Sequence, residues 1–290
     1  DLMRNAEAAL RHSKHASERI EFYEPAMSAH VAAALAIETR LRRACERNEF
    51  VLHYQPKLSL TSGQLLGAEA LIRWQDPDHG LVAPGLFIPV LEDTGMIIEV
   101  GRWVVQQVYA DLCAWSARGI SVPRIAVNVS ALQLQRKDFV DSMINEIQRG
   151  GNRPQWLELE ITESVVMAKG DDNPRKLSQL RQLGVTVTID DFGTGYSSLS
   201  YLARLPVDSL KIDQSFIASM KDSAEATSIV STIITLAHGL KLKVVAEGVE
   251  TVAQCNMLKE LGCDAVQGYL FSKPLPAETF VEKYLLPLTI

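Results

Sequence analysis

Oxygen-bearing side chains recur at the ends of short runs of aliphatic and β-branched residues along this chain. Six of them occupy such positions: Glu69, Asn128, Glu160, Asp190, Asp191 and Glu247. Carboxylates that crowd together repel one another and take up protons unless cations neutralise them. The set contains no histidine, and oxygen ligands favour Mg²⁺ or Mn²⁺ over Zn²⁺. We therefore predict that these side chains converge on a site for hard divalent cations.

Two further features indicate the chemistry of this site. The adjacent Asp190 and Asp191 predict two ions, because one carboxylate can bridge both ions while the other serves the second. Paired metals are a common device for in-line displacement at a phosphoester. Lys211 supplies a cation for charge that develops on a phosphoryl oxygen or an attacking hydroxide. It can alternatively be a salt-bridged structural lysine, or the Schiff-base amine of a barrel aldolase.

The elements that must position these residues follow a regular alternation from Phe50 onward. Short β-branched runs such as IAVNVS, WLELEITE and VTVTIDD alternate with amphipathic stretches such as WVVQQVYADLCAWSARG. Strand alternating with helix predicts a parallel sheet, and about eight strands in one run favour a closed α/β barrel of the (β/α)8, TIM-like type. An open doubly wound sheet is the alternative, but no GxGxxG follows an early strand.

The alternation within each strand predicts which side chains face the barrel axis. In WLELEITE, Leu157, Leu159 and Ile161 alternate with Glu158 and Glu160. The outer face of a barrel strand packs on helices, so the apolar set must point outward and the polar set inward. The polar residues then meet near the carboxyl ends of the strands, where barrel enzymes keep their active sites. By this parity Glu158 and Asp213 (in SLKID) can be either functional or structural rim groups.

Composition narrows the class of protein. The chain has 290 residues, and 47% of them are hydrophobic. Its net charge of -6 disfavours DNA or RNA as a partner, but a small anion can still be held through metals. Its four cysteines form no CxxC pair, which favours a reducing, cytoplasmic compartment. No apolar run approaches the length of a membrane span, although an upstream tether in a longer protein stays compatible with the sequence.

The first 47 residues differ in character from the rest. They are helical in pattern, and Pro25 separates an Ala-rich stretch from a charged helix. We predict that residues 1–47 are the end of a preceding domain plus a connecting helix, and that the barrel occupies residues 48–290.

Seven ordered motifs carry a family resemblance over roughly residues 50–286. They are E-A-L with its following Arg (Glu69 to Arg73), NVS at Asn128, LEITE ending at Glu163, DDFGTG from Asp190, KID at Lys211, AEGVE from Glu247 and QGYLFSKP from Gln267. Together they resemble the signature of EAL-domain cyclic-di-GMP phosphodiesterases. The resemblance implies hydrolysis of c-di-GMP to linear pGpG by a metal-activated water, with Mg²⁺ or Mn²⁺ as cofactor.

The resemblance also implies roles for individual residues. The ligands of one metal would be Glu69, Asn128, Glu160 and Asp190, and those of the second Asp190, Asp191 and, through water, Glu247. The catalytic set would comprise Glu247 with Lys211, which orients the attacking water, Gln267, which supports metal-bound waters, and Glu163, which braces the loop after Asp191. The substrate contacts would be Arg73 at a phosphate and Gln55 at a guanine, with Leu71, Asp213, Tyr269 and Pro274.

Partners follow from the resemblance as well. The segment NAEAALRHSKHASERIEFYEP resembles the last helix and strand of a GGDEF-type domain, so an upstream GGDEF-like or sensory domain is expected in the full protein. The family also implies a homodimer. A sensor that binds c-di-GMP without cutting it is the alternative function; such sensors lose metal ligands or the signature glutamate, whereas this chain keeps them.

Overall fold

The computed structural model of this protein describes residues 25–167, 172–195, 199–221 and 223–286. The chain divides into two compact units: the first contains the described residues up to 51 together with 73–97, and the second contains 52–72 together with the rest from 98 onward. The predicted GGDEF-like tail falls mostly on residues 1–24, outside the described residues. Its assignment and the domain boundary after residue 47 stay predictions.

The second unit is built on a closed barrel of eight strands. Around the barrel they run β1 (Phe50–Ser59), β9 (Ala265–Val266), β8 (Lys243–Ala246), β7 (Ser209–Ile212), β6 (Thr186–Phe192), β5 (Leu157–Thr162), β4 (Arg124–Asn128) and β2 (Leu65–Asp76). A pairing between β1 and β2 closes the circle, and neighbours from β2 through β4 to β9 are parallel. The short β10 (Leu275–Pro276) pairs with β1. The expected barrel is confirmed.

The first strand departs from a uniform alternation of strand and helix. β1 runs antiparallel to β9. A tight turn joins β1 to β2, and in this turn Ser59 N–H donates to the Gln64 carbonyl at 2.9 Å. A parallel crossover needs a dozen or more residues, and residues 60–64 are too few for one. Gly63 supplies the left-handed conformation, with φ of 69°, that such a turn requires.

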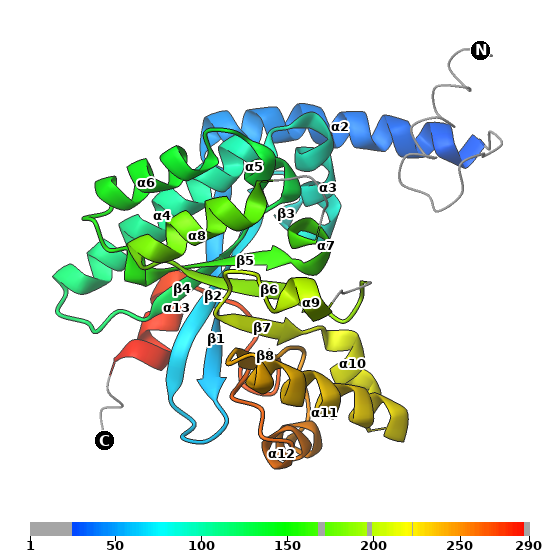
Figure 1. Ribbon diagram of the computed structural model, residues 1–290. Coiled ribbons are helices and arrows are strands. Elements are labelled where there is room, and N and C mark those ends of the chain that lie inside the picture. The colour runs from blue at the N-terminus through cyan, green and yellow to red at the C-terminus, as the bar shows by residue number, and fades with distance from the viewer. Residues whose placement is uncertain (1–24, 168–171, 196–198, 222, 287–290) are drawn as a thin grey trace. The chain divides into compact units, whose positions relative to one another are not determined.

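Helices surround these strands, on their outer side and beyond their carboxyl ends (Figure 1). They are α4 (Ile97–Ala117), α5 (Ala131–Gln135), α6 (Phe139–Arg149), α7 (Glu163–Val166), α8 (Asn173–Leu183), α9 (Leu199–Leu202), α10 (Gln214–Ser219), α11 (Ala224–Gly239), α12 (Val252–Glu260) and α13 (Ala277–Phe280), with one turn of 3₁₀-helix at Pro154–Trp156 and of π-helix at Val281–Leu285. Leu157, Leu159 and Ile161 are fully buried in the core that the strands share with these helices. The apolar parity of β5 therefore supports the barrel wall.

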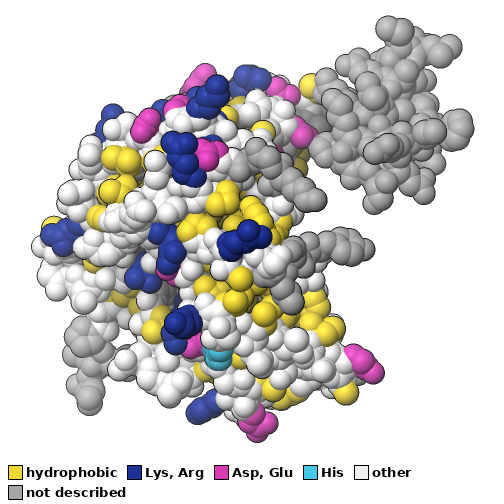
Figure 2. All heavy atoms as spheres, viewed as in Figure 1, with side chains coloured by type: hydrophobic (Ala, Val, Ile, Leu, Met, Phe, Trp, Pro, Cys, Tyr) yellow, Lys and Arg dark blue, Asp and Glu magenta, His cyan; other side chains and the backbone are white. Residues whose placement is uncertain are grey.

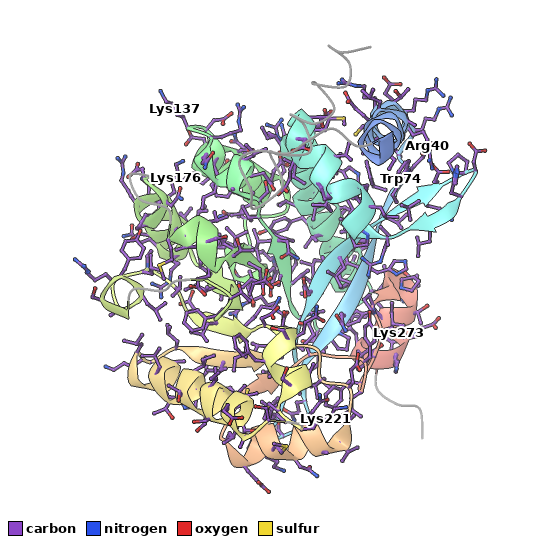
Figure 3. All side chains as sticks on the ribbon, turned by 90° about the vertical axis from the view of Figure 1, so that its right-hand side faces the viewer. Arg40, Trp74, Lys137, Lys176, Lys221 and Lys273 are labelled. Carbon is purple, nitrogen blue, oxygen red and sulfur yellow. The ribbon has the colours of Figure 1, made fainter. Side chains whose placement is uncertain are left out.

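The first unit contains α2 (Pro25–Arg47), β3 (Gly80–Val82) and α3 (Pro84–Thr94). Trp74, at the end of β2, packs edge-on against Phe87 with ring centroids 6.0 Å apart. The guanidinium of Arg40 lies over the indole ring of Trp74 at 4.8 Å (Figure 3). Arg40 also donates to the buried Asp76 at 3.0 Å. These contacts attach α2 to the β2–β3 hairpin within this unit.

The face of the molecule drawn in Figure 2 carries charged side chains of both signs. On the face drawn in Figure 2, Lys and Arg side chains are scattered among acidic and apolar ones. Among the described residues, none of the helices combines the length and hydropathy needed to cross a bilayer.

Candidate active site

A buried lysine lies at the centre of an acidic cluster at the barrel mouth. Lys211 projects from β7 and is 1% exposed. Its Nζ lies 2.8 Å from Glu160 Oε2, 3.2 Å from Asp190 Oδ1, 3.5 Å from Glu69 Oε2 and 2.5 Å from Glu247 Oε1. The four carboxylates belong to β2, β5, β6 and the segment after β8. The structure thus brings together acids that are distant in sequence.

Strand register explains why Asn128 joins this cluster. In the parallel pair of β4 and β5, Asn128 is the partner of Glu160. Its side-chain amide donates to Glu69 Oε1 at 2.7 Å, so it reaches the acid of the neighbouring strand on the other side. Parallel strands end together at one edge, and their terminal polar side chains therefore meet.

A β-bulge places Asp190 and Asp191 on the same side. The register of β6 against β7 shifts between Ile189 and Phe192, and Asp191 has a left-handed φ of 52°. Pleating alone would aim neighbouring side chains to opposite faces. Here Asp190, Asp191 and Glu247 each offer a carboxylate oxygen within 4.8 Å of the others. This distance suits shared coordination of a cation.

Burial makes most of these carboxylates reluctant to ionise. Burial, reinforced by Glu160, raises the pKa of Glu69, and burial likewise raises the pKa of Asp190 although Lys211 opposes it. Burial raises the pKa of Glu247 to about 8. For Glu160, burial is outweighed by the ammonium groups of Lys211 and Lys57, which lower its pKa to about 2. Ionising the whole cluster thus needs more positive charge than the two lysines supply.

The residues of the cluster fit divalent cations. Besides the acids named above, Glu158 and the ammonium of Lys57 lie within it, so fully ionised carboxylates outnumber ammonium groups six to two. Two divalent ions would neutralise this excess. The Gln267 amide donates to Glu69 Oε2 at 2.6 Å, while its buried Oε1 has no hydrogen-bond partner within the described part of the chain. Such an acceptor is suited to a metal-bound water, since buried polar atoms are normally paired.

Glu163 lies behind the loop that follows the two aspartates. Its Oε2 accepts a hydrogen bond from Gly193 N–H at 2.8 Å. A Cβ at Gly195 would approach Glu163 Oε1 to 2.9 Å, so the loop backbone passes close to this carboxylate. The contact fits the predicted bracing of the loop, whose catalytic importance stays a prediction.

The predicted substrate contacts divide into two groups. Gln55, Leu71 and Tyr269 line a pocket of about 260 Å³ that also contains Glu69, Asp190, Lys211, Glu247 and Gln267. The other three are not among the residues that line this pocket. Asp213 caps α10 by accepting from Ser215 N–H at 2.9 Å. Burial raises the pKa of Asp191, and the charge of Asp213 helps to raise it further. Pro274 directly precedes β10, and Arg73 belongs to the first unit. All six roles stay predictions.

Three polar side chains of the site had no role predicted from the sequence. Gln214 and Glu250 line the same pocket, and Lys57 bonds to Glu160 inside the barrel. The inward direction of Lys57 could have been predicted, because Lys57 lies two residues after Gln55 and therefore on the same strand face. Gln214 and Glu250 lie beyond strand ends, where alternation says nothing about direction.

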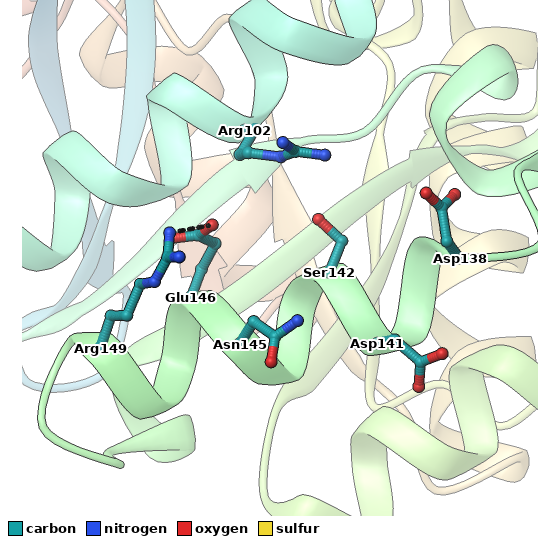
Figure 4. A pocket seen from close by; sticks show the side chains of 7 residues that line it. All are labelled: Arg102, Asp138, Asp141, Ser142, Asn145, Glu146 and Arg149. Carbon is teal, nitrogen blue, oxygen red and sulfur yellow. Dashed lines mark hydrogen bonds and ion pairs between the residues drawn. The ribbon is translucent and has the colours of Figure 1, made fainter.

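A second pocket, of about 200 Å³, lies along α6 and is drawn in Figure 4. It is lined by Arg102, Asp138, Asp141, Ser142, Asn145, Glu146 and Arg149. Its ion pair between Glu146 and Arg149, 3.3 Å apart, joins residues one turn apart on a single helix. Asp138 and Arg149 are largely exposed, so their interactions are screened by water. The barrel mouth is the better candidate for chemistry.

Comparison with known proteins identifies relatives of the chain. Residues 38–274 match the EAL domain. The chain is 45% identical over 279 residues to the bifunctional diguanylate cyclase/cyclic di-GMP phosphodiesterase MucR of Pseudomonas aeruginosa, covering 96% of this chain and 41% of that protein. It is 42% identical over 288 residues to the cyclic di-GMP phosphodiesterase NbdA of the same organism, covering 98% and 37%. It therefore spans less than half of these relatives.

A solved structure of a MucR phosphodiesterase is also similar to this chain. The structure of the PaMucR phosphodiesterase in complex with c-di-GMP superposes with a TM-score of 0.81 at 46% sequence identity. The match covers 84% of this chain and 99% of that one.

Proposed function

We propose that this chain, which belongs to the EAL domain family, is a phosphodiesterase that hydrolyses c-di-GMP to linear pGpG with the help of two divalent cations. The observation that carries the proposal is the convergence of Glu69, Glu160, Asp190 and Glu247 around Lys211. Relatives that are named phosphodiesterases, and one solved with c-di-GMP, support the substrate.

The proposed chemistry divides between the cations and the protein. Two Mg²⁺ or Mn²⁺ ions, held by Glu69, Asn128, Glu160, Asp190 and Asp191 with Glu247 acting through water, would lower the pKa of bound water and neutralise phosphate charge. In the reaction a water oxygen bonds to phosphorus in line and gives up one proton, the bond from phosphorus to the ribose 3′ oxygen breaks, and the 3′ oxygen takes up one proton. Lys211 orients the attacking water and stabilises the charge that develops. Gln267 would accept a hydrogen bond from a metal-bound water through Oε1, which has no partner among the described residues.

The direct test is incubation of the chain with c-di-GMP and Mg²⁺ or Mn²⁺, followed by chromatography. We expect pGpG to accumulate and EDTA to prevent it. Binding of c-di-GMP without formation of pGpG would instead indicate a sensor and would overturn the proposal.

Cation binding should be visible without substrate. We expect Mn²⁺ at about 100 times its dissociation constant to stabilise the chain by about 2.7 kcal/mol for each ion bound, which raises its melting temperature. The physical reason is that the cations relieve repulsion among the buried acids. Differential scanning fluorimetry with and without EDTA measures the shift. A melting temperature that does not respond to Mn²⁺ or Mg²⁺ would contradict the metal site.

Loosening the loop after Asp191 should slow turnover. We expect Glu163→Ala to lower kcat about 10- to 100-fold, because the Gly193 N–H loses a charged acceptor next to proposed metal ligands. Glu163→Gln, which keeps an acceptor oxygen, should lose less. If Glu163→Ala leaves both kcat and the affinity for Mn²⁺ unchanged, the proposed bracing of the loop by Glu163 is wrong.

The proposal extends to the context of the chain. We expect a cytoplasmic homodimer, with an upstream GGDEF-like or sensory domain in the full-length protein. Turnover per chain, measured against protein concentration alongside sedimentation, tests the dimer: activity that falls as the dimer dissociates is expected, and constant activity from a monomer would contradict it.

A further inference from the structure

We propose that Lys57 is a positioning residue of the cation site, which holds the Glu160 carboxylate so that one of its oxygens faces the cations. This inference rests on the proposed function, because it concerns the same site. Lys57 lies on the antiparallel strand β1, is 4% exposed, and belongs to none of the motifs that define the family resemblance. Its ammonium lies inside the barrel, where it contacts Glu160. Gln55, two residues earlier on the same strand face, also points inward and accepts a hydrogen bond from Gln267 Nε2 at 3.0 Å.

Two lysines hold the two oxygens of Glu160 separately. Lys57 Nζ lies 2.5 Å from Oε1, and Lys211 Nζ lies 2.8 Å from Oε2. Lys211 in turn contacts the carboxylates of Asp190 and Glu247, so Oε2 is the oxygen that faces the acidic cluster. Oε1 is anchored by Lys57. A carboxylate fixed in this way can offer a cation one oxygen in a constant direction, as partners of metal ligands commonly ensure.

The anchor is itself held by a chain of hydrogen bonds across the barrel. Lys57 Nζ lies 2.7 Å from Glu158 Oε1, which also accepts from Thr188 Oγ1 at 2.9 Å. The Thr188 hydroxyl lies 2.6 Å from Ser209 Oγ. Glu158 balances the charge of Lys57, and residues of β5, β6 and β7 fix its direction. Lys57 therefore has the rigidity that a positioning residue requires.

A role in positioning and a role as a mere counter-ion make opposite predictions. The ammonium of Lys57 repels a nearby divalent cation, so its removal would tighten cation binding if charge were its only effect. If Lys57 orients Glu160, its removal frees the carboxylate to turn, and cation binding weakens. The sign of the change in Mn²⁺ affinity therefore separates the two roles.

The experiment uses Lys57→Met, which keeps the length of the side chain without its charge. Mn²⁺ alone is titrated into the metal-free protein by calorimetry, and hydrolysis of c-di-GMP is measured separately. We expect the dissociation constant for Mn²⁺ to rise about 10- to 100-fold and kcat to fall by a similar factor. The matched control is Lys243→Met, which removes a lysine from an exposed ion pair with Asp264 and should change neither value.

Tighter or unchanged Mn²⁺ binding in Lys57→Met would overturn the inference. If this variant does not fold, Lys57→Gln decides by the same criterion, because a neutral amide binds carboxylates more weakly than an ammonium group does. If the unsubstituted chain binds Mn²⁺ but forms no pGpG, the proposed function fails, and the Mn²⁺ affinity of the variant still decides on Lys57.

Discussion

Glu69→Ala and Asp190→Ala are each expected to abolish hydrolysis of c-di-GMP while the fold persists. Both side chains contact Lys211 in the cluster and are proposed cation ligands. A bound metal contributes several kcal/mol to stabilisation of the transition state, and each 1.36 kcal/mol is a factor of ten. We therefore expect kcat to fall by about 10³ or more. Chromatography of pGpG at saturating Mn²⁺ measures the loss.

The fold should survive these substitutions because two effects oppose each other. Removing one carboxylate relieves repulsion among buried acids. It also leaves former donors unpaired, since Glu69 accepts from Asn128 and Gln267, at a cost of about 1–3 kcal/mol. A typical folding free energy of about 5–15 kcal/mol tolerates this. Asp141→Ala, on the exposed side of α6, is the matched control, and circular dichroism monitors the fold. Hydrolysis retained in either variant would refute the ligand assignment.

The second large effect is expected for Lys211→Met. Its ammonium lies within 3.5 Å of four carboxylates, two of which, Glu160 and Glu247, lie within 2.8 Å. Loss of one such group that stabilises developing charge costs about 10²–10³ in kcat. The metal-free variant should also be less stable than the parent, because removing one partner of a buried ion pair costs about 3–5 kcal/mol. Steady-state kinetics and thermal unfolding measure the two effects.

Cations should partly compensate for the missing lysine. Mn²⁺ supplies positive charge to the same acids, so the rise in melting temperature on adding Mn²⁺ should be larger in Lys211→Met than in the parent chain. Lys243→Met, which lies in an exposed ion pair, should show the shift of the parent. If Lys211→Met has the same kcat as the parent chain, Lys211 has no role in the chemistry. Trapping of a carbonyl compound on Lys211 by borohydride would revive the aldolase alternative.

Much of the fold and of the site could be predicted from local patterns. A strand buried on its outer face must alternate, and Leu157, Leu159 and Ile161 against Glu160 show that alternation directly in the sequence. Parallel strands share one edge, so polar side chains near their ends had to meet once a barrel was assumed. The cluster of Glu69, Glu160 and Lys211 therefore follows from period and chain direction alone.

The pairing of strands in the folded chain decided the position of Lys57 and the directions of Asp190 and Asp191. The pairings of β1 with β9 and with β2 close the barrel, and this closure brings Lys57 to Glu160. The bulge in β6 exists through its register against β7, and together with the left-handed φ of Asp191 it accounts for the proximity of the two aspartates. Alternation is a property of a single strand, whereas bulges and the closure of a barrel arise between strands that are distant in the chain. The sequence by itself thus determined which acids, and which lysine, could meet near the strand ends, and the tertiary structure determined how they face one another and added Lys57 to them.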